Sequence, residues 1–296
     1  MRRKPPKPAW RRAVVRVAQT LIAAVGALLI MGLTGCLEHA LVYFPSTVPF
    51  TTPPGARDVT FPTEDGATLH GWFIPARGAD GPAPTVLHTH GNAGAIPDHA
   101  EYVAWLAGHG FNVFLFDYRG YGRSDPPSGL RNRDAYIADA RAALDHLLTR
   151  TDVDPDRIAL LGFSLGAVLG GNAAAERDEI AAVALCAGFS TWKGAAGDYL
   201  PVVGPLVMPS GRDLKDAAAR LGDRPLLIVH GSADRIVKPR HAPIIADAAR
   251  DAGVAVETHI EPGADHNTLL VAFPDAREAI LRFLERELGA GDNPED

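Results

Sequence analysis

The chain of 296 residues predicts an α/β fold built around a doubly wound, mostly parallel sheet. Three observations lead to this class. Short apolar runs recur along the chain as buried strands do, helical stretches separate them, and glycines and prolines mark the junctions. Strand and helix that alternate at this spacing are typical of a parallel sheet with right-handed crossovers.

The first strands are expected to form an antiparallel pair. Residues 59–61 and Thr68–Ile74 alternate apolar and polar residues, and Glu64-Asp65-Gly66 between them is a turn sequence. Six apolar runs then predict strands that helices cover on both sheet faces. These runs are 85–89, 112–116, 158–163, 181–186, 225–229 and 254–260.

Helices are expected in the intervals between these runs, at 98–108, 134–149, 165–176, 239–252 and 275–287. Asp134 is predicted to cap its helix at the N-terminus, and Gly108 and Gly110 are predicted to end theirs. Residues 188–224 break the alternation. Their apolar stretch 199–210 contains several prolines, so it cannot be a regular helix throughout. Two interpretations stay open, a lid that lines an acyl pocket and a connection packed on the sheet edge.

Composition excludes several classes of protein. A content of 47% hydrophobic residues is enough to form a core, and two cysteines exclude a disulfide scaffold and a cysteine-based zinc site. The net charge of −6 argues against nucleic acid as a partner. That charge is unevenly distributed. Residues 1–35 hold seven basic residues and no acidic one, which leaves 22 basic and 35 acidic residues, a net charge of −13, in the remainder.

The basic, apolar N-terminus predicts export. Residues 13–37 are almost continuously apolar after a basic stretch, as in a secretory signal. Leu33-Thr34-Gly35-Cys36 resembles the lipobox of bacterial lipoproteins, in which the signal is cut before the cysteine and the cysteine then carries the lipid. The alternative is an uncleaved anchor, because about 20 apolar residues span a bilayer and basic residues hold the N-terminal end in the cytoplasm. Both interpretations predict an exported, membrane-anchored protein.

The domain organisation follows from these patterns. Residues 1–35 are expected to be the signal peptide or membrane anchor, 36–55 a tether, and 56–288 one catalytic domain. Within that domain 188–224 is the lid-like segment, and 289–296 is expected to be a flexible tail.

The chemistry of the chain is expected to start at Gly162-Phe163-Ser164-Leu165-Gly166, a GxSxG motif between a predicted strand and a predicted helix. A serine at such a sharp turn needs small neighbours so that its Oγ stays accessible. The N–H of Leu165 at the start of the helix then points at the place where an oxyanion develops. Ser164 is therefore the predicted nucleophile and Leu165 the first oxyanion donor.

A serine nucleophile needs a base and a group that orients the base. His266 follows the last predicted strand, and Asp234 follows the strand before it. Both lie where the carboxyl ends of parallel strands place functional loops, and the order serine, aspartate, histidine is that of a known hydrolase triad. Asp265 is the competing candidate for the acid, but adjacent residues on a loop point apart.

The second oxyanion donor is expected in the glycine-containing loop at 88–94 that follows the first parallel strand. Asn92 is the first candidate and Ala93 the second. His88 and His90 share one strand face and suggest a metal pair, but no third ligand has a matching position. They are therefore expected to brace the loop through hydrogen bonds, and the sequence predicts neither a metal nor a cofactor. Cys186 is expected to be a small core residue, and His230 to hold the loop of Asp234.

Several motifs together resemble the α/β-hydrolase superfamily, with a similarity from about residue 41 to residue 288. They are His90-Gly-Asn92, Asp117-Tyr-Arg-Gly-Tyr-Gly-Arg-Ser124, the motif around Ser164, His230-Gly-Ser-Ala-Asp234 and Asp265-His266-Asn267. The chain looks most like the membrane-anchored branch of depalmitoylases and lysophospholipases, with serine aminopeptidases as cousins. The resemblance implies the α/β-hydrolase fold and the triad roles given above. Asp117 and Arg119 are expected to shape the adjoining loop.

The expected activity is that of a serine hydrolase that cleaves a carboxylic ester or thioester through an acyl-enzyme. Its substrate is expected to be a small acyl ester, a thioester or a lipid. The first alternative is a serine peptidase or aminopeptidase, and the alternative from a different class is a membrane-tethered, non-catalytic binding protein. The sequence leaves the natural substrate and the oligomeric state open.

Overall fold

A computed structural model of the protein describes residues 9–289 and contains a central eight-stranded sheet. The strand order is β10-β9-β8-β7-β4-β6-β3-β2, and only the pairs β2–β3 and β3–β6 are antiparallel. The strands are β2 Arg57–Pro62, β3 Thr68–Ile74, β4 Ala83–Thr89, β6 Asn112–Asp117, β7 Val153–Phe163, β8 Ile180–Cys186, β9 Leu226–Gly231 and β10 Val256–Glu261. A separate parallel pair joins β1, Phe44–Pro45, to β5, Ala93–Gly94.

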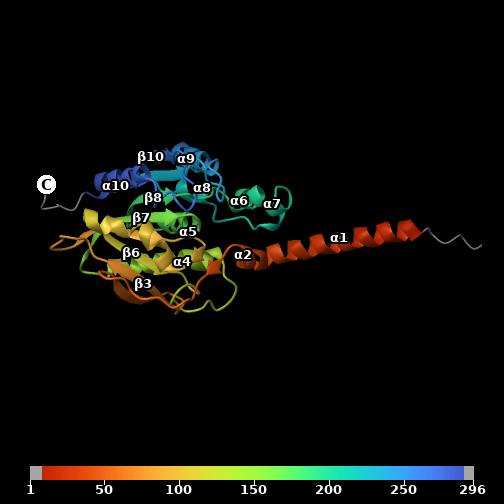
Figure 1. Cartoon of the computed structure of the whole chain (residues 1–296), viewed down its shortest axis with the longest axis horizontal. Helices are drawn as coiled ribbons and strands as arrows, with labels where there is room; N and C mark the ends of the chain where they lie inside the picture. The colour runs from red at the N-terminus through yellow and green to blue at the C-terminus, as the bar shows by residue number, and fades with distance from the viewer. Residues whose placement is uncertain (1–8, 290–296) are drawn as a thin grey trace, which may run out of the picture.

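Helices cover both faces of the sheet (Figure 1). One core cluster packs α4, Arg133–Leu148, α5, Leu165–Ala174, and the later helices α8, Leu214–Ala218, and α9, His241–Asp251, on one face. The second cluster packs α10, Pro274–Leu288, and the short elements α3 Ile96–His99, η1 Ala100–Tyr102 and η2 Ala104–His109 on the other. The predicted fold class, a mostly parallel doubly wound sheet, is confirmed.

Most predicted elements occur within a few residues of their expected bounds, with two corrections. The helix expected at 98–108 is a short α-turn followed by 3₁₀ turns, because the fully buried Val103 adopts a non-helical φ of −137°. The cap expected at Asp134 is Asn132, whose side chain accepts a hydrogen bond from the Ala135 N–H at 3.0 Å. The Asp134 carboxylate instead binds Arg212.

The segment at 188–224 contains three short helices, α6 Trp192–Tyr199, α7 Val203–Val207 and α8. The prediction that its proline-containing stretch is not one regular helix is confirmed, because the chain leaves helical geometry between α6 and α7. Figure 1 shows α6 and α7 at the end of the body from which the N-terminal helix emerges.

That N-terminal helix is α1, Ala9–Leu33, and it extends away from the body (Figure 1). Its stretch Ala13–Gly32 has the length and the hydropathy, a mean of 2.1, that a membrane crossing needs. A short helix follows, α2, Cys36–Leu41, and after it Tyr43 is buried in the core. Thus part of the segment expected to be a tether, 36–55, packs against the body. Residues 290–296 of the expected flexible tail lie outside the described part of the chain, and so do residues 1–8 with the basic residues among them.

Candidate active site

The predicted nucleophile lies at the junction of β7 and α5. Ser164 precedes the first residue of α5 and has φ 56° and ψ −119°, a conformation that few residues other than glycine adopt. Its N–H donates to the Cys186 carbonyl at the end of β8 at 2.8 Å, so the neighbouring strand fixes the turn. Cys186 itself is buried, as expected, and burial raises the pKa of its thiol to about 12.

The two glycines of the motif have a steric role. A Cβ on Gly166 would lie 1.9 Å from the Thr89 carbonyl oxygen at the end of β4, and a Cβ on Gly162 would lie 2.6 Å from the Ala167 Cα. Both distances are far below van der Waals contact. The turn at Ser164 therefore requires glycine on either side, as the motif predicted from the sequence alone.

The structure brings Ser164, Asp234 and His266 together from three separate loops. Ser164 Oγ lies 2.9 Å from His266 Nε2, and His266 Nδ1 lies 2.7 Å from Asp234 Oδ2. All three side chains are almost completely buried. In this geometry Nδ1–H donates to the carboxylate, so Nε2 is the atom left to accept the serine proton.

The surroundings of Asp234 keep its carboxylate charged. Burial acts to raise its pKa, but hydrogen bonds from His230 and His266 outweigh burial and hold the pKa well below the usual range. His230 Nε2 lies 2.8 Å from the Val237 carbonyl and so also braces the loop that carries Asp234. Asp265, the competing acid, instead accepts hydrogen bonds from Asn267 and Thr268 in its own turn.

The loop of the second predicted oxyanion donor lies beside the nucleophile. A Cβ on Gly91 would lie 3.7 Å from the Ser164 Cβ, so the backbone before Asn92 lies next to the turn at Ser164. The Asn92 carbonyl accepts hydrogen bonds from the Phe44 N–H and the Tyr121 hydroxyl, both at 2.8 Å, and its side chain donates to the Val42 carbonyl. Residues that directly follow the N-terminal helices therefore hold this loop.

The two histidines of this region contact backbone rather than one another. His88 Nδ1 donates to the Leu161 carbonyl at 2.9 Å, and His90 Nδ1 lies 2.8 Å from the Gly91 carbonyl. Burial is the largest influence on both and lowers the pKa of His88 to about 3 and that of His90 well below its usual value. Asp117 accepts from the Ile96 N–H, and Arg119 pairs with Asp139 and Asp65. These contacts shape the loops next to the triad.

Sequence reasoning missed a second serine–histidine–aspartate arrangement. Ser190 Oγ lies 2.8 Å from His241 Nδ1, and His241 Nε2 lies 3.0 Å from Asp198 Oδ2. The Ser190 N–H also donates to His241 Nδ1, and Asp198 pairs with Lys238 and Arg240. Ser190 and Asp198 lie in the lid-like segment and His241 lies at the start of α9, and they carry no local motif, so only the tertiary contacts reveal the arrangement. They join the start of the lid-like segment to α9.

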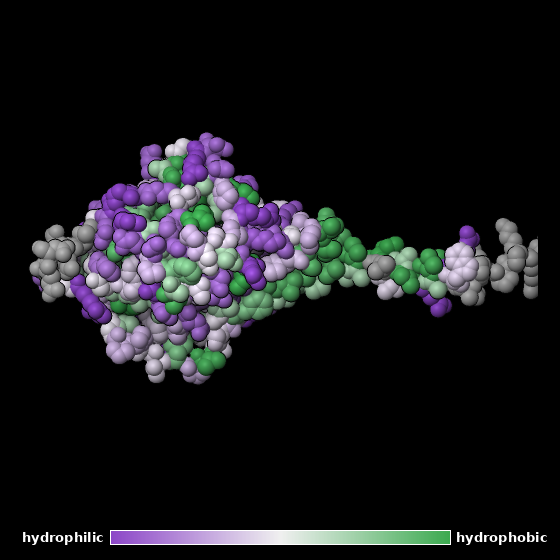
Figure 2. Space-filling model, turned by 45° about the horizontal axis from the view of Figure 1, so that its top comes forward, coloured by the Kyte–Doolittle hydropathy of each residue, from purple (hydrophilic) through white to green (hydrophobic). Residues whose placement is uncertain are grey.

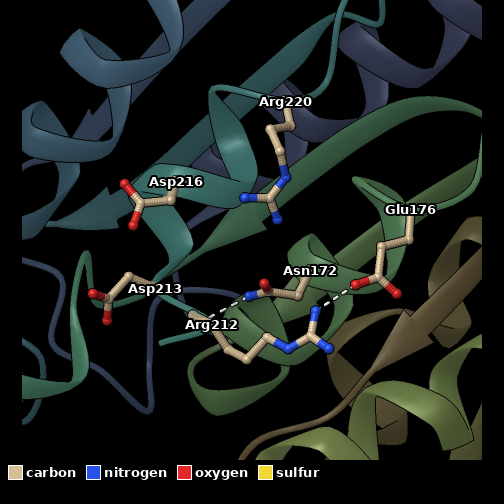
Figure 3. A pocket seen from close by; sticks show the side chains of 6 residues that line it. All are labelled: Asn172, Glu176, Arg212, Asp213, Asp216 and Arg220. Atoms are coloured by element: carbon tan, nitrogen blue, oxygen red, sulfur yellow. Dashed lines mark hydrogen bonds and ion pairs between the residues drawn. The ribbon is translucent and has the colours of Figure 1, made fainter. Parts of the chain in front are cut away.

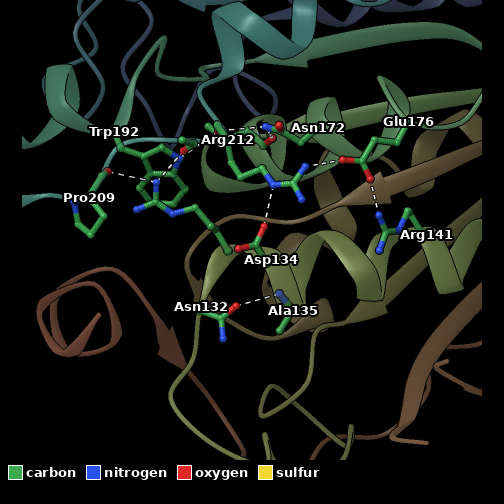
Figure 4. A network of polar contacts seen from close by, with 12 residues as sticks. Asn132, Asp134, Ala135, Arg141, Asn172, Glu176, Trp192, Pro209 and Arg212 are labelled. Atoms are coloured by element: carbon green, nitrogen blue, oxygen red, sulfur yellow. Dashed lines mark hydrogen bonds and ion pairs between the residues drawn. The ribbon is translucent and has the colours of Figure 1, made fainter. Parts of the chain in front are cut away.

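A polar depression of about 330 Å³ lies at the opposite end of α5 from Ser164 (Figure 3). Its lining is charged or polar: Asn172, Glu176, Arg212, Asp213, Asp216 and Arg220. Figure 4 shows Arg212 between Asp134 and Glu176, with Glu176 also paired to Arg141. This network ties the lid-like segment to α4 and α5, and it contains no member of the predicted triad.

Comparison with known proteins identifies the family. Residues 80–208 match the family model described as serine aminopeptidase, S33. The chain is 32% identical to YfhR of Salmonella typhi over 85% of this chain and 89% of that protein. It is also 32% identical to the alpha/beta hydrolase domain-containing protein WAV2 of Arabidopsis thaliana, over 78% of this chain and 79% of WAV2. The chain therefore belongs to the α/β-hydrolase family.

Solved structures agree with this fold. The esterase Pf2001 of Pyrococcus furiosus superimposes with a TM-score of 0.70 at 21% sequence identity, over 84% of this chain and 99% of that one. At this level of identity the likeness concerns the fold. The α/β-hydrolase fold expected from the motifs is thus confirmed.

Proposed function

We propose that the protein is a serine hydrolase that cleaves a carboxylic ester or thioester through an acyl-enzyme intermediate, with Ser164, His266 and Asp234 as its triad. The observation that carries this proposal is the continuous chain of two short contacts from Ser164 Oγ through the imidazole to Asp234. It supplies a nucleophile, a base in the required tautomer, and a charged acid.

In the proposed reaction His266 Nε2 takes the proton of Ser164 as Oγ attacks the carbonyl carbon. The backbone N–H groups of Leu165 and Asn92 stabilise the oxyanion in this proposal. Leu165 is the first residue of α5, so its N–H has no acceptor within the helix and is available to the oxyanion. The imidazolium then gives its proton to the leaving alcohol or thiol as the acyl-enzyme forms. Water, deprotonated by His266, releases the carboxylic acid and restores Ser164.

The proposal includes attachment to a membrane. The apolar stretch Ala13–Gly32, the basic residues before it and Cys36 after it support an exported protein held at the membrane, either by a lipid on Cys36 or by α1. The nearby Asn92 loop contacts Val42 and Phe44, so the anchored end and the oxyanion loop are directly joined.

The nucleophile is tested by labelling with a fluorophosphonate, which reacts with an activated serine. We expect the full-length protein to be labelled and Ser164→Ala to lose labelling completely. The matched control is Ser190→Ala, which removes a second serine whose hydroxyl lies within hydrogen-bond distance of a buried histidine ring. We expect this variant to stay labelled. If labelling survived in Ser164→Ala and disappeared in Ser190→Ala, the nucleophile would be Ser190, and the assignment of Ser164 would be wrong.

A peptidase is the second candidate, and the match to the serine aminopeptidase model supports it. Turnover of aminoacyl amides is compared with turnover of p-nitrophenyl esters of increasing acyl length. We expect ester hydrolysis, and activity restricted to aminoacyl amides would favour the peptidase. A folded protein that neither reacts with the probe nor turns over any substrate would instead support a tethered binding protein.

A further inference from the structure

The end of α6, the loop after it and α7 together carry an apolar surface that neither the proposed triad nor the core uses. Its exposed side chains form what we call the α6–α7 patch: Tyr199, Leu200, Val202, Val203 and Leu206. Val202 is 75% exposed and Leu206 is 68% exposed. No charged residue occurs from Tyr199 to Gly211. A run of large exposed apolar side chains without charge marks an interaction surface.

The position of the patch identifies what it contacts. Gly32, the last residue of the apolar stretch in α1, packs so closely on α7 that a Cβ there would lie 2.1 Å from the Val207 carbonyl oxygen. The 20 residues Ala13–Gly32 span about 30 Å as a helix, the thickness of a bilayer core. If this stretch crosses a membrane, its end at Gly32 lies at the bilayer surface, and α7 lies there as well.

The hydrophobic surface is continuous between the two elements. In Figure 2 the green surface of α1 extends onto the end of the body where the helix meets it. Figure 1 places α6 and α7 at that same end. In the cleaved form Gly32 and its contact with α7 are absent, but a lipid on Cys36 would still enter the bilayer near α7, because Cys36 follows Gly32 by only four residues.

The patch is also joined to the candidate active site. The Tyr199 hydroxyl donates to the Ile236 carbonyl at 2.7 Å, in the loop that carries Asp234. Asp198, at the end of α6, binds Arg240 and His241 beyond the same loop. The patch is thus joined to the loop of Asp234 on one side and to α1 on the other. A membrane contact at the patch would therefore hold the proposed triad close to the membrane.

We propose that the α6–α7 patch inserts into the surface of the lipid bilayer beside the N-terminal anchor, which is α1 or a lipid on Cys36, and holds the hydrolase domain with its proposed triad near the membrane. This inference rests on the proposed membrane attachment. It assigns the lid-like segment a partner, the lipid acyl region just below the headgroups. Substrates whose acyl chains lie in the bilayer then reach Ser164 without crossing bulk water.

The test measures the depth of single labels in the full chain. Val202→Cys and Leu206→Cys are each made in a Cys36→Ser background, which retains α1, and labelled with an environment-sensitive nitrobenzoxadiazole dye. Cys186 is buried and stays unlabelled. The proteins are reconstituted in phosphatidylcholine vesicles with and without nitroxide-bearing lipids. The control label is Arg282→Cys, an exposed site on α10.

We expect the emission of dyes at positions 202 and 206 to be shifted to the blue in vesicles, and nitroxide lipids to quench it. The dye at position 282 is expected to show neither effect. Labels at 202 and 206 that behave like the label at 282 would overturn the proposal. A blue shift that nitroxide lipids do not quench, and that disappears when protein is diluted in lipid, would also overturn it and assign the patch to a second copy of the chain. The measurement is repeated with Ser164→Ala, so its result is independent of hydrolysis.

Discussion

Ser164 combines a strained backbone with tightly packed neighbours. Its positive φ costs on the order of 1–3 kcal/mol, which the surrounding structure must offset. The hydrogen bond from its N–H to Cys186 and the close approach of Gly166 to β4 supply that support. The strain serves the proposed chemistry, because it directs Oγ at His266 from the end of a strand.

At the residue scale, the buried histidines predict a loss of stability in mild acid. Burial lowers the pKa of His88 to about 3, whereas an unfolded histidine titrates near 6.5. Below pH 6.5 the unfolded chain therefore binds a proton that the folded chain does not, and the free energy of unfolding falls. One such histidine contributes up to about 1.4 kcal/mol per pH unit.

We expect His88→Asn, which retains a donor for the Leu161 carbonyl, to reduce this pH dependence. The measurement is urea denaturation in detergent between pH 7 and about pH 5. The residual slope of the variant is expected to come from the other histidines whose pKa values burial lowers, which are His90, His99, His146 and His241. Asp58 and Asp65 have pKa values near 2, so they lose their contribution only at lower pH. Identical slopes in the variant and the parent would contradict the prediction.

At the element scale, α2 is joined to the body by a buried ion pair. Glu38 Oε2 lies 2.5 Å from Arg133 Nη2 at the start of α4, and the Tyr43 hydroxyl donates to the same carboxylate. Arg133 also donates to the Gly211 carbonyl and stacks on the ring of Trp192 in α6. One guanidinium thus connects the N-terminal segment, the hydrolase body and the lid-like segment.

Removal of the carboxylate leaves this guanidinium buried without its partner. We therefore expect Glu38→Ala to destabilise the protein by about 3–5 kcal/mol, measured by chemical denaturation in detergent. The matched control is Glu278→Ala, which breaks an exposed pair with Arg282 on α10 and is expected to cost about 0.3–0.5 kcal/mol. A loss in Glu38→Ala no larger than in this control would show that α2 is not held by the pair.

At the scale of the whole molecule, the basic leader, residues 1–35, and the acidic body, the rest of the chain, are expected to have separate roles. The leader is expected to direct export, and the body carries the site. If Cys36 is the lipid-bearing residue, the contact between Gly32 and α7 is lost on maturation, while the contacts of Glu38, Tyr43 and Phe44 with the body remain.

We expect the mature, membrane-bound polypeptide to begin at Cys36 and to carry a lipid there. Intact-mass spectrometry of the membrane fraction measures this directly, and Cys36→Ala is expected to keep the leader. A membrane form of the unmodified protein that still begins at Met1 would show instead that α1 is an uncleaved anchor.

The elements that the sequence predicted well are those with strong local patterns. The continuously apolar strands have one favourable environment, between two helical layers, so β6 and β8 were each predicted to within one residue of their bounds. The helix expected at 98–108 was not predicted correctly, because the burial of the Val103 side chain outweighs the helical preference of the surrounding segment. The cap of α4 was assigned to Asp134 because no local signal shows that Arg212, far along the chain, takes that carboxylate.

The sequence by itself determined the class of the fold, the turn around Ser164 and the residues of the proposed triad, because strand period, glycine sterics and short motifs are local properties. Tertiary structure decided what depends on segments far apart in the chain. The distances within the triad, the Ser190–His241–Asp198 arrangement and the contact between α1 and α7 are of this kind. The sequence marked residues 199–210 as apolar, and only the fold shows that Val207 among them lies against Gly32 at the end of α1, because that contact joins segments far apart in the chain.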